Sequence, residues 1–151
     1  MKVAVIGSRG RMGAEVCRAV ESADDLELVA AVDAGDDRSG VEAADVVVEF
    51  TVPDAAMGNI EWCIGHGLDV VVGTTGFDDA KLEQVRRWLE GRASRVVIAS
   101  NYSIGAILMM EFARQAAPHF ESVEIIEAHH PNKVDAPSGT AATTARKIAL
   151  A

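Results

Sequence analysis

The chain has 151 residues, the size of one typical domain, and its 49% hydrophobic content is enough for a buried core. Its formal net charge of −9 at pH 7 disfavours a broad basic surface for nucleic acid or anionic lipid. No apolar run reaches the roughly 18 residues that span a membrane, and the apolar start breaks at Gly7, too early for a signal peptide. We therefore expect a folded cytoplasmic protein without a nucleic-acid or membrane partner.

The acidic excess lies entirely in the first half of the chain. Residues 1–75 contain 14 acidic and five basic residues, whereas residues 76–151 contain nine of each. An anionic substrate should therefore bind through the charge-balanced second half. The two cysteines, Cys17 and Cys63, lack the spacing of metal ligands, so we expect two buried, reduced thiols and no metal site.

Short β-rich apolar runs alternate with amphipathic segments, which is typical of an α/β fold with a doubly wound, Rossmann-like parallel sheet. The predicted strands are residues 3–6, 27–32, 45–50, 69–72 and 95–99. The predicted helices between them are residues 11–22, 54–66 and 78–91, and residues 33–40 are expected to form a loop or one short turn. Together these elements predict a dinucleotide-binding domain over residues 1–102.

The remaining residues, 103–151, predict the start of a smaller α+β substrate domain. A helix is expected over residues 103–117, ended by Pro118. Over residues 122–128, apolar Val123 and Ile125 are interleaved with acidic residues, which indicates a half-exposed strand. A loop over residues 129–137 follows, and Ser138 is expected to cap a final helix.

A glycine-rich turn directly after the first strand predicts a dinucleotide site. Its residues are Gly7, Ser8, Arg9, Gly10, Arg11, Met12 and Gly13. Glycines here allow the backbone to approach a pyrophosphate at the start of the following helix. Asp33, 20 residues beyond Gly13, can accept hydrogen bonds from the adenosine ribose diol. Ala34 offers no cation for a 2′-phosphate, although Arg9, Arg11 and Arg38 could, so NADH is favoured without excluding NADPH.

Two further strand ends carry small polar residues. They are Gly73, Thr74 and Thr75 after the fourth strand, and Ser100, Asn101 and Tyr102 after the fifth. Ligands in doubly wound sheets bind at the carboxyl ends of strands. Thr75 and Asn101 can therefore face the nicotinamide, although ordinary turn chemistry explains either loop equally well.

The segment from Glu127 to Thr140 carries the clearest chemical signal. It combines two adjacent histidines, a nearby lysine and a Ser-Gly-Thr helix start, namely His129, His130, Lys133, Ser138, Gly139 and Thr140. These residues offer proton donors, a fixed cation and backbone donors for a carboxylate. Such clustering favours chemistry over packing.

With this segment in view, the chain resembles the 4-hydroxy-tetrahydrodipicolinate reductase family, also called the dihydrodipicolinate reductase family. The resemblance covers residues 5–13, 49–53, 73–76, 101–105 and above all 129–140. It implies an NAD(P)H-dependent hydride transfer to a cyclic dicarboxylate, giving tetrahydrodipicolinate in the diaminopimelate route to lysine.

The resemblance also implies residue roles. His129 would donate or accept a proton and Lys133 would donate one, while His130 would contact the substrate and Gly139 and Thr140 would hold a carboxylate. The residues that match the family's cofactor contacts are Gly7 to Met12, Asp33, Gly73 to Thr75, and Ala99 to Tyr102. The arginine that often follows the family's acidic residue is replaced by Ala34.

Length is the main departure from the family pattern. Members continue beyond the Ser-Gly-Thr helix to complete a mixed sheet in the substrate domain, whereas this sequence stops at Ala151. The resemblance therefore implies a C-terminally truncated member. Because those strands form the interface of the family's homotetramer, both tetramer assembly and activity are in question for this length of chain.

Two other functions stay open from the sequence. One is a dinucleotide-binding module or fragment without turnover. The other is a related amino-acid dehydrogenase, such as one for aspartate or homoserine. These dehydrogenases share the glycine-rich turn but are not expected to combine His129 and His130 with Lys133 and the Ser-Gly-Thr helix start.

Overall fold

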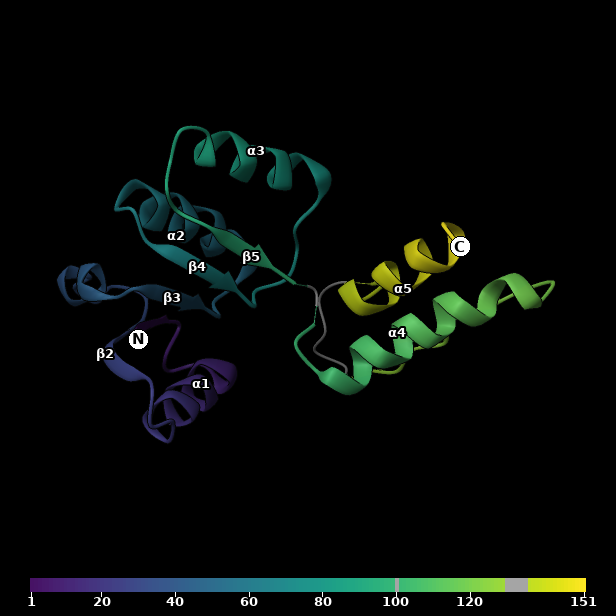
Figure 1. The fold of residues 1–151 in the computed structure, drawn as a ribbon, viewed down its shortest axis with the longest axis horizontal. Coiled ribbons are helices and arrows are strands. Elements are labelled where there is room, and N and C mark those ends of the chain that lie inside the picture. The colour runs from purple at the N-terminus through teal and green to yellow at the C-terminus, as the bar shows by residue number, and fades with distance from the viewer. Residues whose placement is uncertain (100, 130–135) are drawn as a thin grey trace. The chain divides into compact units, whose positions relative to one another are not determined.

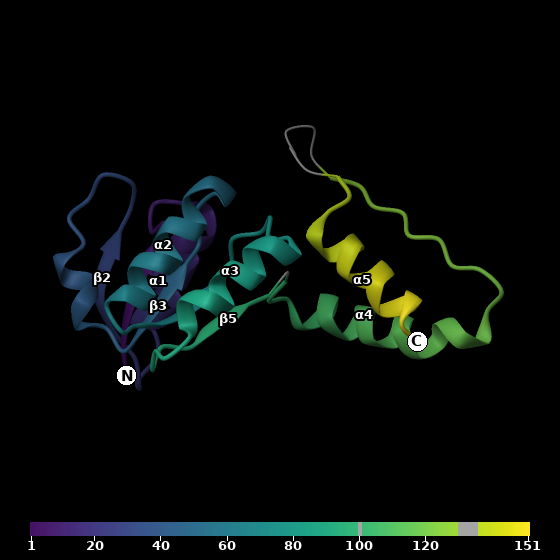
Figure 2. The same cartoon turned by 90° about the horizontal axis from the view of Figure 1, so that it is seen from above.

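The computed structural model describes residues 1–99, 101–129 and 136–151. These residues form two compact units, Met1–Ala99 and Ser100–Ala151, which are drawn in Figures 1 and 2. Within the described residues, no helix combines the length and apolar character needed to cross a membrane.

The first unit is built around a five-stranded, fully parallel sheet, which confirms the predicted fold class. Its order is β2-β1-β3-β4-β5. The strands are β1 (Lys2–Ile6), β2 (Glu27–Val32), β3 (Val46–Glu49), β4 (Asp69–Val72) and β5 (Val96–Ile98). The order reverses beside β1, because the chain passes from β1 to β2 on one side and later adds β3 on the other.

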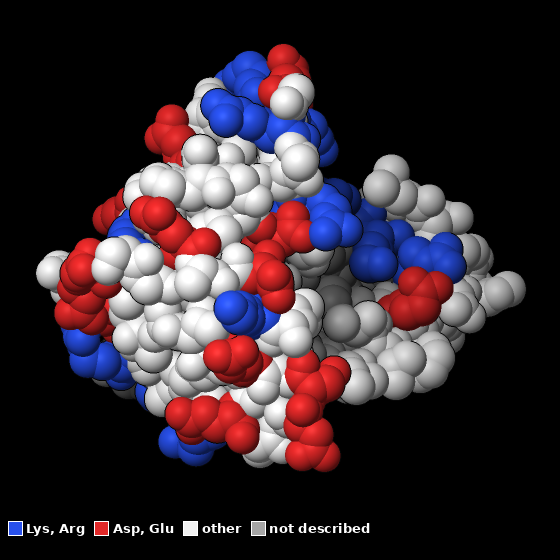
Figure 3. All heavy atoms as spheres, turned by 60° about the vertical axis from the view of Figure 1, so that its left-hand side comes forward, with Lys and Arg blue, Asp and Glu red and all other residues white. Residues whose placement is uncertain are grey.

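Helices cover the two faces of this sheet. Figure 1 shows α1 (Arg11–Glu21) on one face and α2 (Pro53–Gly65) and α3 (Asp79–Leu89) on the other. A short 3-10 helix, η1 (Ser39–Ala43), follows the polar loop after β2. On the face drawn in Figure 3, acidic side chains are spread over this unit with basic side chains set among them.

The core of the first unit consists of β-branched strand residues packed against α2. Val47, Val70, Val72, Ile60 and Cys63 are all within 1% of complete burial. Runs of valine suit central parallel strands because both faces of such strands are covered. Both cysteines are free, but Cys17 is only partly buried, because α1 packs on the sheet with one face alone.

The second unit contains α4 (Ile104–Ala116), a 3-10 turn η2 (Ala117–His119) and α5 (Gly139–Ala149), with α4 and α5 in contact. The prediction of a strand over residues 122–128 is wrong. Figure 2 shows this segment as an extended chain after α4, but it pairs with no strand among the residues described. A strand requires a neighbouring strand for its backbone hydrogen bonds. The five strands found in the described residues all pair within the sheet of the first unit, so none of them pairs with residues 122–128.

Candidate functional site

The glycine-rich turn after β1 makes two close backbone contacts that only glycine permits. Gly7 has a φ of +90°, and a Cβ there would lie 2.1 Å from the Phe50 carbonyl oxygen. A Cβ at Gly13 would lie 2.0 Å from the Gly7 carbonyl oxygen. The Gly7 N–H also donates to the Val32 carbonyl oxygen at 2.8 Å, which ties the turn to the end of β2.

This turn leads into the start of α1. Gly10 is the N-cap residue, and the first turn of the helix contains no acidic side chain. The first backbone N–H groups of a helix have no partner within it, and they carry a partial positive charge. The start of α1 can therefore accept an anion such as a pyrophosphate.

Asp33, directly after β2, presents a fixed carboxylate beside this turn. Its Oδ1 accepts from the Ala34 N–H at 2.8 Å and its Oδ2 from the Arg9 N–H at 3.0 Å. These two backbone hydrogen bonds lower the pKa of Asp33 because they favour its charged form. An ionised Asp33 can accept hydrogen bonds from a ribose diol and repels a phosphate.

The turn and Asp33 line one cleft of about 450 Å³ at the carboxyl ends of β1 and β3. Ligands of doubly wound sheets bind at this point, where the strand order reverses. The other lining residues are Ile6, Ala34, Arg38, Phe50, Thr51, Val52, Ala55 and Asn59. Of the seven predicted turn residues, Gly7, Arg9 and Gly10 line this cleft, while Arg11 and Met12 lie exposed on the first turn of α1.

A buried network beneath the cleft was not predicted from the sequence. Glu49, at the end of β3, is completely buried, and its Oε1 accepts from the Thr51 hydroxyl and from Asn59 Nδ2 at 3.2 Å. Asn59 Oδ1 in turn accepts from Arg38 Nη2 at 2.7 Å, and the Arg38 guanidinium lies 5.5 Å from the centre of the Trp62 ring. The sequence signal available for this network was a glutamate at the end of a run of valines.

The loop after β4 supports this edge of the sheet. The Gly73 N–H donates to the Glu49 carbonyl oxygen at 2.8 Å. Thr74 is buried, and its hydroxyl accepts from the Thr51 N–H at 2.8 Å, whereas Thr75 is exposed. Thr74 therefore holds the neighbouring loop in place, and Thr75 is the residue of this pair that faces solvent.

The residues predicted after β5 divide between the two units. Ala99 ends the first unit, and Asn101 and Tyr102 belong to the second. Asn101 Nδ2 donates to the Thr140 hydroxyl at 3.0 Å, and its Oδ1 accepts from the Ser103 N–H at 2.7 Å. Three predicted site residues lie outside the described residues, namely Ser100, His130 and Lys133.

The predicted Ser-Gly-Thr helix start is formed in the second unit. Ser138 is the N-cap of α5, and its hydroxyl accepts from the Ala141 N–H at 3.1 Å. The first turn of α5 carries no acidic side chain. His129, Ser138 and Thr140 line a hollow of about 520 Å³ together with Glu127 and apolar side chains of α4 and α5. The start of α5 offers backbone N–H groups to an anion, and two carboxylates, Glu124 and Glu127, also line the hollow.

Glu127 connects the histidine to the helix start, a role the sequence did not indicate. Its Oε1 accepts from the Ser138 N–H at 2.9 Å, and its Oε2 lies 3.8 Å from His129 Nδ1. Residues two apart in an extended segment share a side, so the Glu-x-His spacing could have suggested the pair. No three His, Cys, Asp or Glu side chains within the described residues are grouped in a way that could hold a metal ion.

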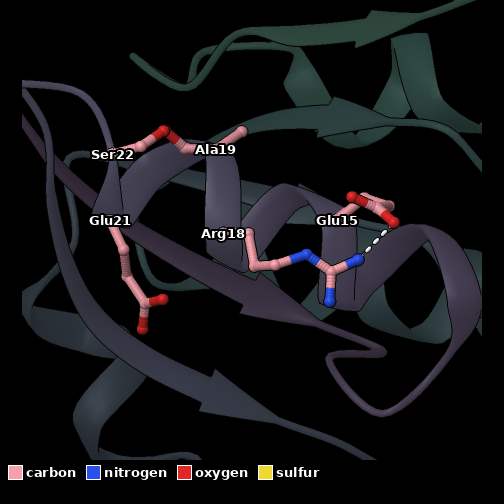
Figure 4. A pocket seen from close by; sticks show the side chains of 5 residues that line it. All are labelled: Glu15, Arg18, Ala19, Glu21 and Ser22. Atoms are coloured by element: carbon pink, nitrogen blue, oxygen red, sulfur yellow. Dashed lines mark hydrogen bonds and ion pairs between the residues drawn. The ribbon is translucent and has the colours of Figure 1, made fainter.

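A further hollow lies on the outer surface of α1 (Figure 4). It is lined by Glu15, Arg18, Ala19, Glu21 and Ser22, and the Arg18 guanidinium is paired with Glu15. The hollow therefore has no free cation and no buried polar group, and we assign it no function.

Comparison with known proteins gives the same family over both units. Residues 1–102 match the model of "Dihydrodipicolinate reductase, N-terminus", and residues 105–150 match that of "Dihydrodipicolinate reductase, C-terminus". The chain is 60% identical to the 4-hydroxy-tetrahydrodipicolinate reductase of Cutibacterium acnes over 152 aligned residues and 62% identical to that of Thermobifida fusca. All of this chain is covered in both cases, but it spans about 62% of the length of these relatives.

Solved structures agree with this result. The structure of dipicolinate-bound dihydrodipicolinate reductase from Paenisporosarcina sp. TG-14 matches with a TM-score of 0.78 and 37% identity, covering 99% of this chain and 66% of that one. Aspartate dehydrogenase from Thermotoga maritima matches with a TM-score of 0.54 at 17% identity over 75% of this chain and 51% of that one, which shows a shared fold alone. Because the models of both the N-terminal and the C-terminal part of the family match, the chain belongs to the dihydrodipicolinate reductase family.

Proposed function

We propose that this chain serves the NAD(P)H-dependent reduction of 4-hydroxy-tetrahydrodipicolinate to tetrahydrodipicolinate, in the diaminopimelate route to lysine. One observation carries the proposal: a chain 60% identical to a reductase of this name holds both a glycine-rich turn with Asp33 and a Ser138-capped helix start beside His129. The first arrangement suits a dinucleotide and the second suits a small dicarboxylate.

In this proposal the first unit binds the nucleotide. The start of α1 meets the pyrophosphate, and Asp33 accepts hydrogen bonds from the adenosine ribose. Gly73, Thr74 and Thr75 are proposed contacts from the loop after β4. Ala99, Ser100, Asn101 and Tyr102 remain predicted cofactor contacts as well.

The second unit would bind the substrate and move the proton. NAD(P)H, when bound, supplies a hydride, so the protein has to deliver one proton and release one water from the 4-hydroxy substrate. Lys133 is the proposed proton donor and His129 the proposed donor or acceptor, with Glu127 Oε2 lying 3.8 Å from His129 Nδ1. His130 would contact the substrate, and Ser138, Gly139 and Thr140 at the start of α5 would hold a carboxylate.

We further propose that NADH is preferred, or at least tolerated as well as NADPH. Asp33 suits a free ribose diol, and Ala34 supplies no cation. Titration of the protein with each nucleotide, followed by fluorescence or calorimetry, tests this preference. Asp33→Ala should reduce the discrimination, and if neither nucleotide bound, the proposed dinucleotide site would be wrong.

The catalytic roles are tested by kinetics on the complete gene product. Losing a positioned acid or base typically costs about 10²- to 10⁴-fold in rate. His129→Ala and Lys133→Ala should therefore lower kcat by that order and leave NADH affinity nearly unchanged. His119→Ala, an exposed histidine on η2, is the matched control and should retain kcat.

The alternative function gives a different result in the same assays. A dinucleotide-binding module without turnover would bind NADH and show no reduction of the dicarboxylate in any variant. Near-normal kcat in both His129→Ala and Lys133→Ala would instead contradict the proposed catalytic roles of these two residues. Membership of the family would not be affected. We also propose a cytoplasmic location, which the two free cysteines support.

A further inference from the structure

The Arg9 side chain of the glycine-rich turn is paired with a carboxylate from the loop after β2. Arg9 Nη1 lies 2.7 Å from Asp36 Oδ2, and Arg9 Nη2 lies 3.4 Å from Asp36 Oδ1. Two of the three guanidinium nitrogens therefore contact the same carboxylate, which is a two-point geometry that orients the arginine side chain. The ion pair lies at the rim of the cleft that Arg9 and Asp33 line.

The loop backbone fixes Asp36 in this position. Asp36 Oδ2 accepts from the Asp33 N–H at 2.8 Å, and the Asp36 N–H donates to the Asp33 carbonyl oxygen at 3.1 Å. Asp33 itself accepts from the Arg9 N–H. Arg9 is thus held by two carboxylates, Asp33 at its backbone and Asp36 at its guanidinium, and the same loop positions both.

The other arginine of this cleft is also engaged. Arg38 donates to Asn59 Oδ1 at 2.7 Å and lies over the Trp62 ring. A 2′-phosphate on the adenosine ribose would lie near Asp33, where the ribose diol is expected. It would meet the carboxylates of Asp33 and Asp36 there, and Arg9, which lines the same cleft, is paired with Asp36.

We propose that Asp36 is a specificity-determining residue that disfavours NADPH by pairing with Arg9 and by placing a second negative charge beside Asp33. The inference rests on the proposed nucleotide site and extends it. Two carboxylates then account for the preference for NADH. Asp33 binds the ribose diol, and Asp36 pairs with the Arg9 guanidinium, which would otherwise be able to bind a 2′-phosphate.

Asp36→Asn is the substitution that isolates this effect. The asparagine Oδ1 can still accept from the Asp33 N–H, so the loop keeps its hydrogen bond while the charge is lost. The Arg9 and Asp36 side chains are 63% and 36% exposed, and exposed ion pairs contribute little to folding stability. The variant is therefore expected to fold as the parent does.

Asp37→Asn is the matched control. Asp37 lies next to Asp36 in the same loop, but its carboxylate is bonded to the Ser39 hydroxyl at 2.7 Å and the Ser39 N–H at 3.0 Å. Both substitutions change the net charge by the same amount. Only Asp36→Asn removes the negative charge that is paired with Arg9.

The experiment measures the dissociation constants of NADH and NADPH for the parent, both single variants and the double variant Asp36→Asn with Arg9→Ala. Removing one negative charge near a phosphate and leaving the Arg9 charge unneutralised should tighten NADPH binding about fivefold to tenfold in Asp36→Asn. NADH binding should change less than about twofold, since Asp33 is intact. Asp37→Asn should leave the ratio of the two constants near that of the parent. Arg9→Ala in the Asp36→Asn background should remove the gain.

Three results overturn the inference. An unchanged ratio in Asp36→Asn would show that the pair does not affect the choice of nucleotide. An equal gain in Asp37→Asn would assign the effect to net charge, and a gain that survives Arg9→Ala would separate it from Arg9. If the parent bound neither nucleotide, the proposed function itself would be wrong. The inference about Asp36 is wrong on its own if the parent binds a nucleotide but the variants give one of these three results.

Discussion

The two units of the chain differ sharply in how well they bury their apolar residues. In the first unit, Val5, Val47 and Ile60 are fully buried between the sheet and its helices. In the described part of the second unit, Met110 is the one buried hydrophobic residue, while Ile104 is 75% and Ile126 91% exposed. A five-stranded sheet with helices on both faces encloses a core, whereas two helices and an extended segment leave most of theirs open to water.

This difference separates the two proposed tasks. The proposed nucleotide site is a turn fixed to a well-packed sheet. The proposed substrate site is an N-cap and a short extended segment with little apolar burial of their own. Because Trp62 and Trp88 both lie in the first unit, tryptophan fluorescence reports unfolding of that unit alone, and far-UV circular dichroism reports helices of both.

The largest effect is expected from Gly7→Ala in the first unit. The new Cβ would meet the Phe50 carbonyl oxygen at 2.1 Å, and the residue has a φ of +90°. Left-handed strain and overpacking together should lower the free energy of unfolding by about 3 kcal/mol and abolish NADH binding. Denaturant titration followed by tryptophan fluorescence measures the loss.

Gly35→Ala is the matched control for that variant. Gly35 has a similar φ of +84°, but a Cβ there would meet nothing within 4 Å. It should cost about 1 kcal/mol from backbone strain alone and leave NADH binding in place. Equal losses in the two variants would mean that φ, and not the approach to Phe50, constrains the turn.

A smaller effect, confined to the second unit, is expected from Ser138→Ala. The substitution removes the hydroxyl that accepts from the Ala141 N–H at 3.1 Å, and loss of an N-cap typically costs about 1 kcal/mol. Circular dichroism should show part of the helix signal lost earlier, while the fluorescence transition of the first unit stays unchanged. Ser103→Ala, at the exposed N-cap of α4 with a 3.4 Å bond, should cost less. A larger cost at Ser103 would contradict this ranking of the two caps.

The sequence predicted the first unit well because its signals are local. The run Asp69–Val72 forms a strand over the residues expected, since buried valines between polar residues and glycines leave few alternatives. The predicted spacing of the glycine-rich turn and Asp33 was also realised, because a strand, a turn and a helix fix that distance. The alternation of apolar and acidic residues over 122–128 led to a wrong strand prediction. Such a pattern shows which side of a strand would be buried but does not show whether a partner strand is present.

The rest of the candidate site depends on contacts between residues distant in sequence. Arg38 reaches Asn59, which is 21 positions away, and Glu127 reaches the Ser138 N–H, 11 positions away. These contacts were found only in the structure, although the glutamate that ends a run of valines and the Glu-x-His spacing were sequence signals for Glu49 and Glu127. The catalytic roles of His129 and Lys133 stay predictions until the kinetics are measured.

The smallest effect tests how the helices of the second unit are held together. Glu111 on α4 accepts from Arg114 Nη2 at 2.6 Å and Gln115 Nε2 at 2.9 Å, and it lies 3.9 Å from Lys147 Nζ on α5. Together these hydrogen bonds and charges lower the pKa of Glu111 from 4.5 to about 2. The hydrogen bond from Arg114 contributes most to this shift. A carboxylate whose pKa falls on folding stabilises the folded state above its unfolded pKa and loses that contribution as the pH drops.

Stability of the second unit should therefore fall as the pH is lowered from 4.5 to about 2. Glu111→Gln removes the titrating group, so its circular dichroism transition should depend less on pH than that of the parent across this window. The fluorescence transition of the first unit should respond to pH equally in both proteins, because Glu111 lies in the other unit. Identical pH dependence of the circular dichroism transitions would show that the Glu111 cluster, although well formed, adds nothing to the stability of the weaker unit.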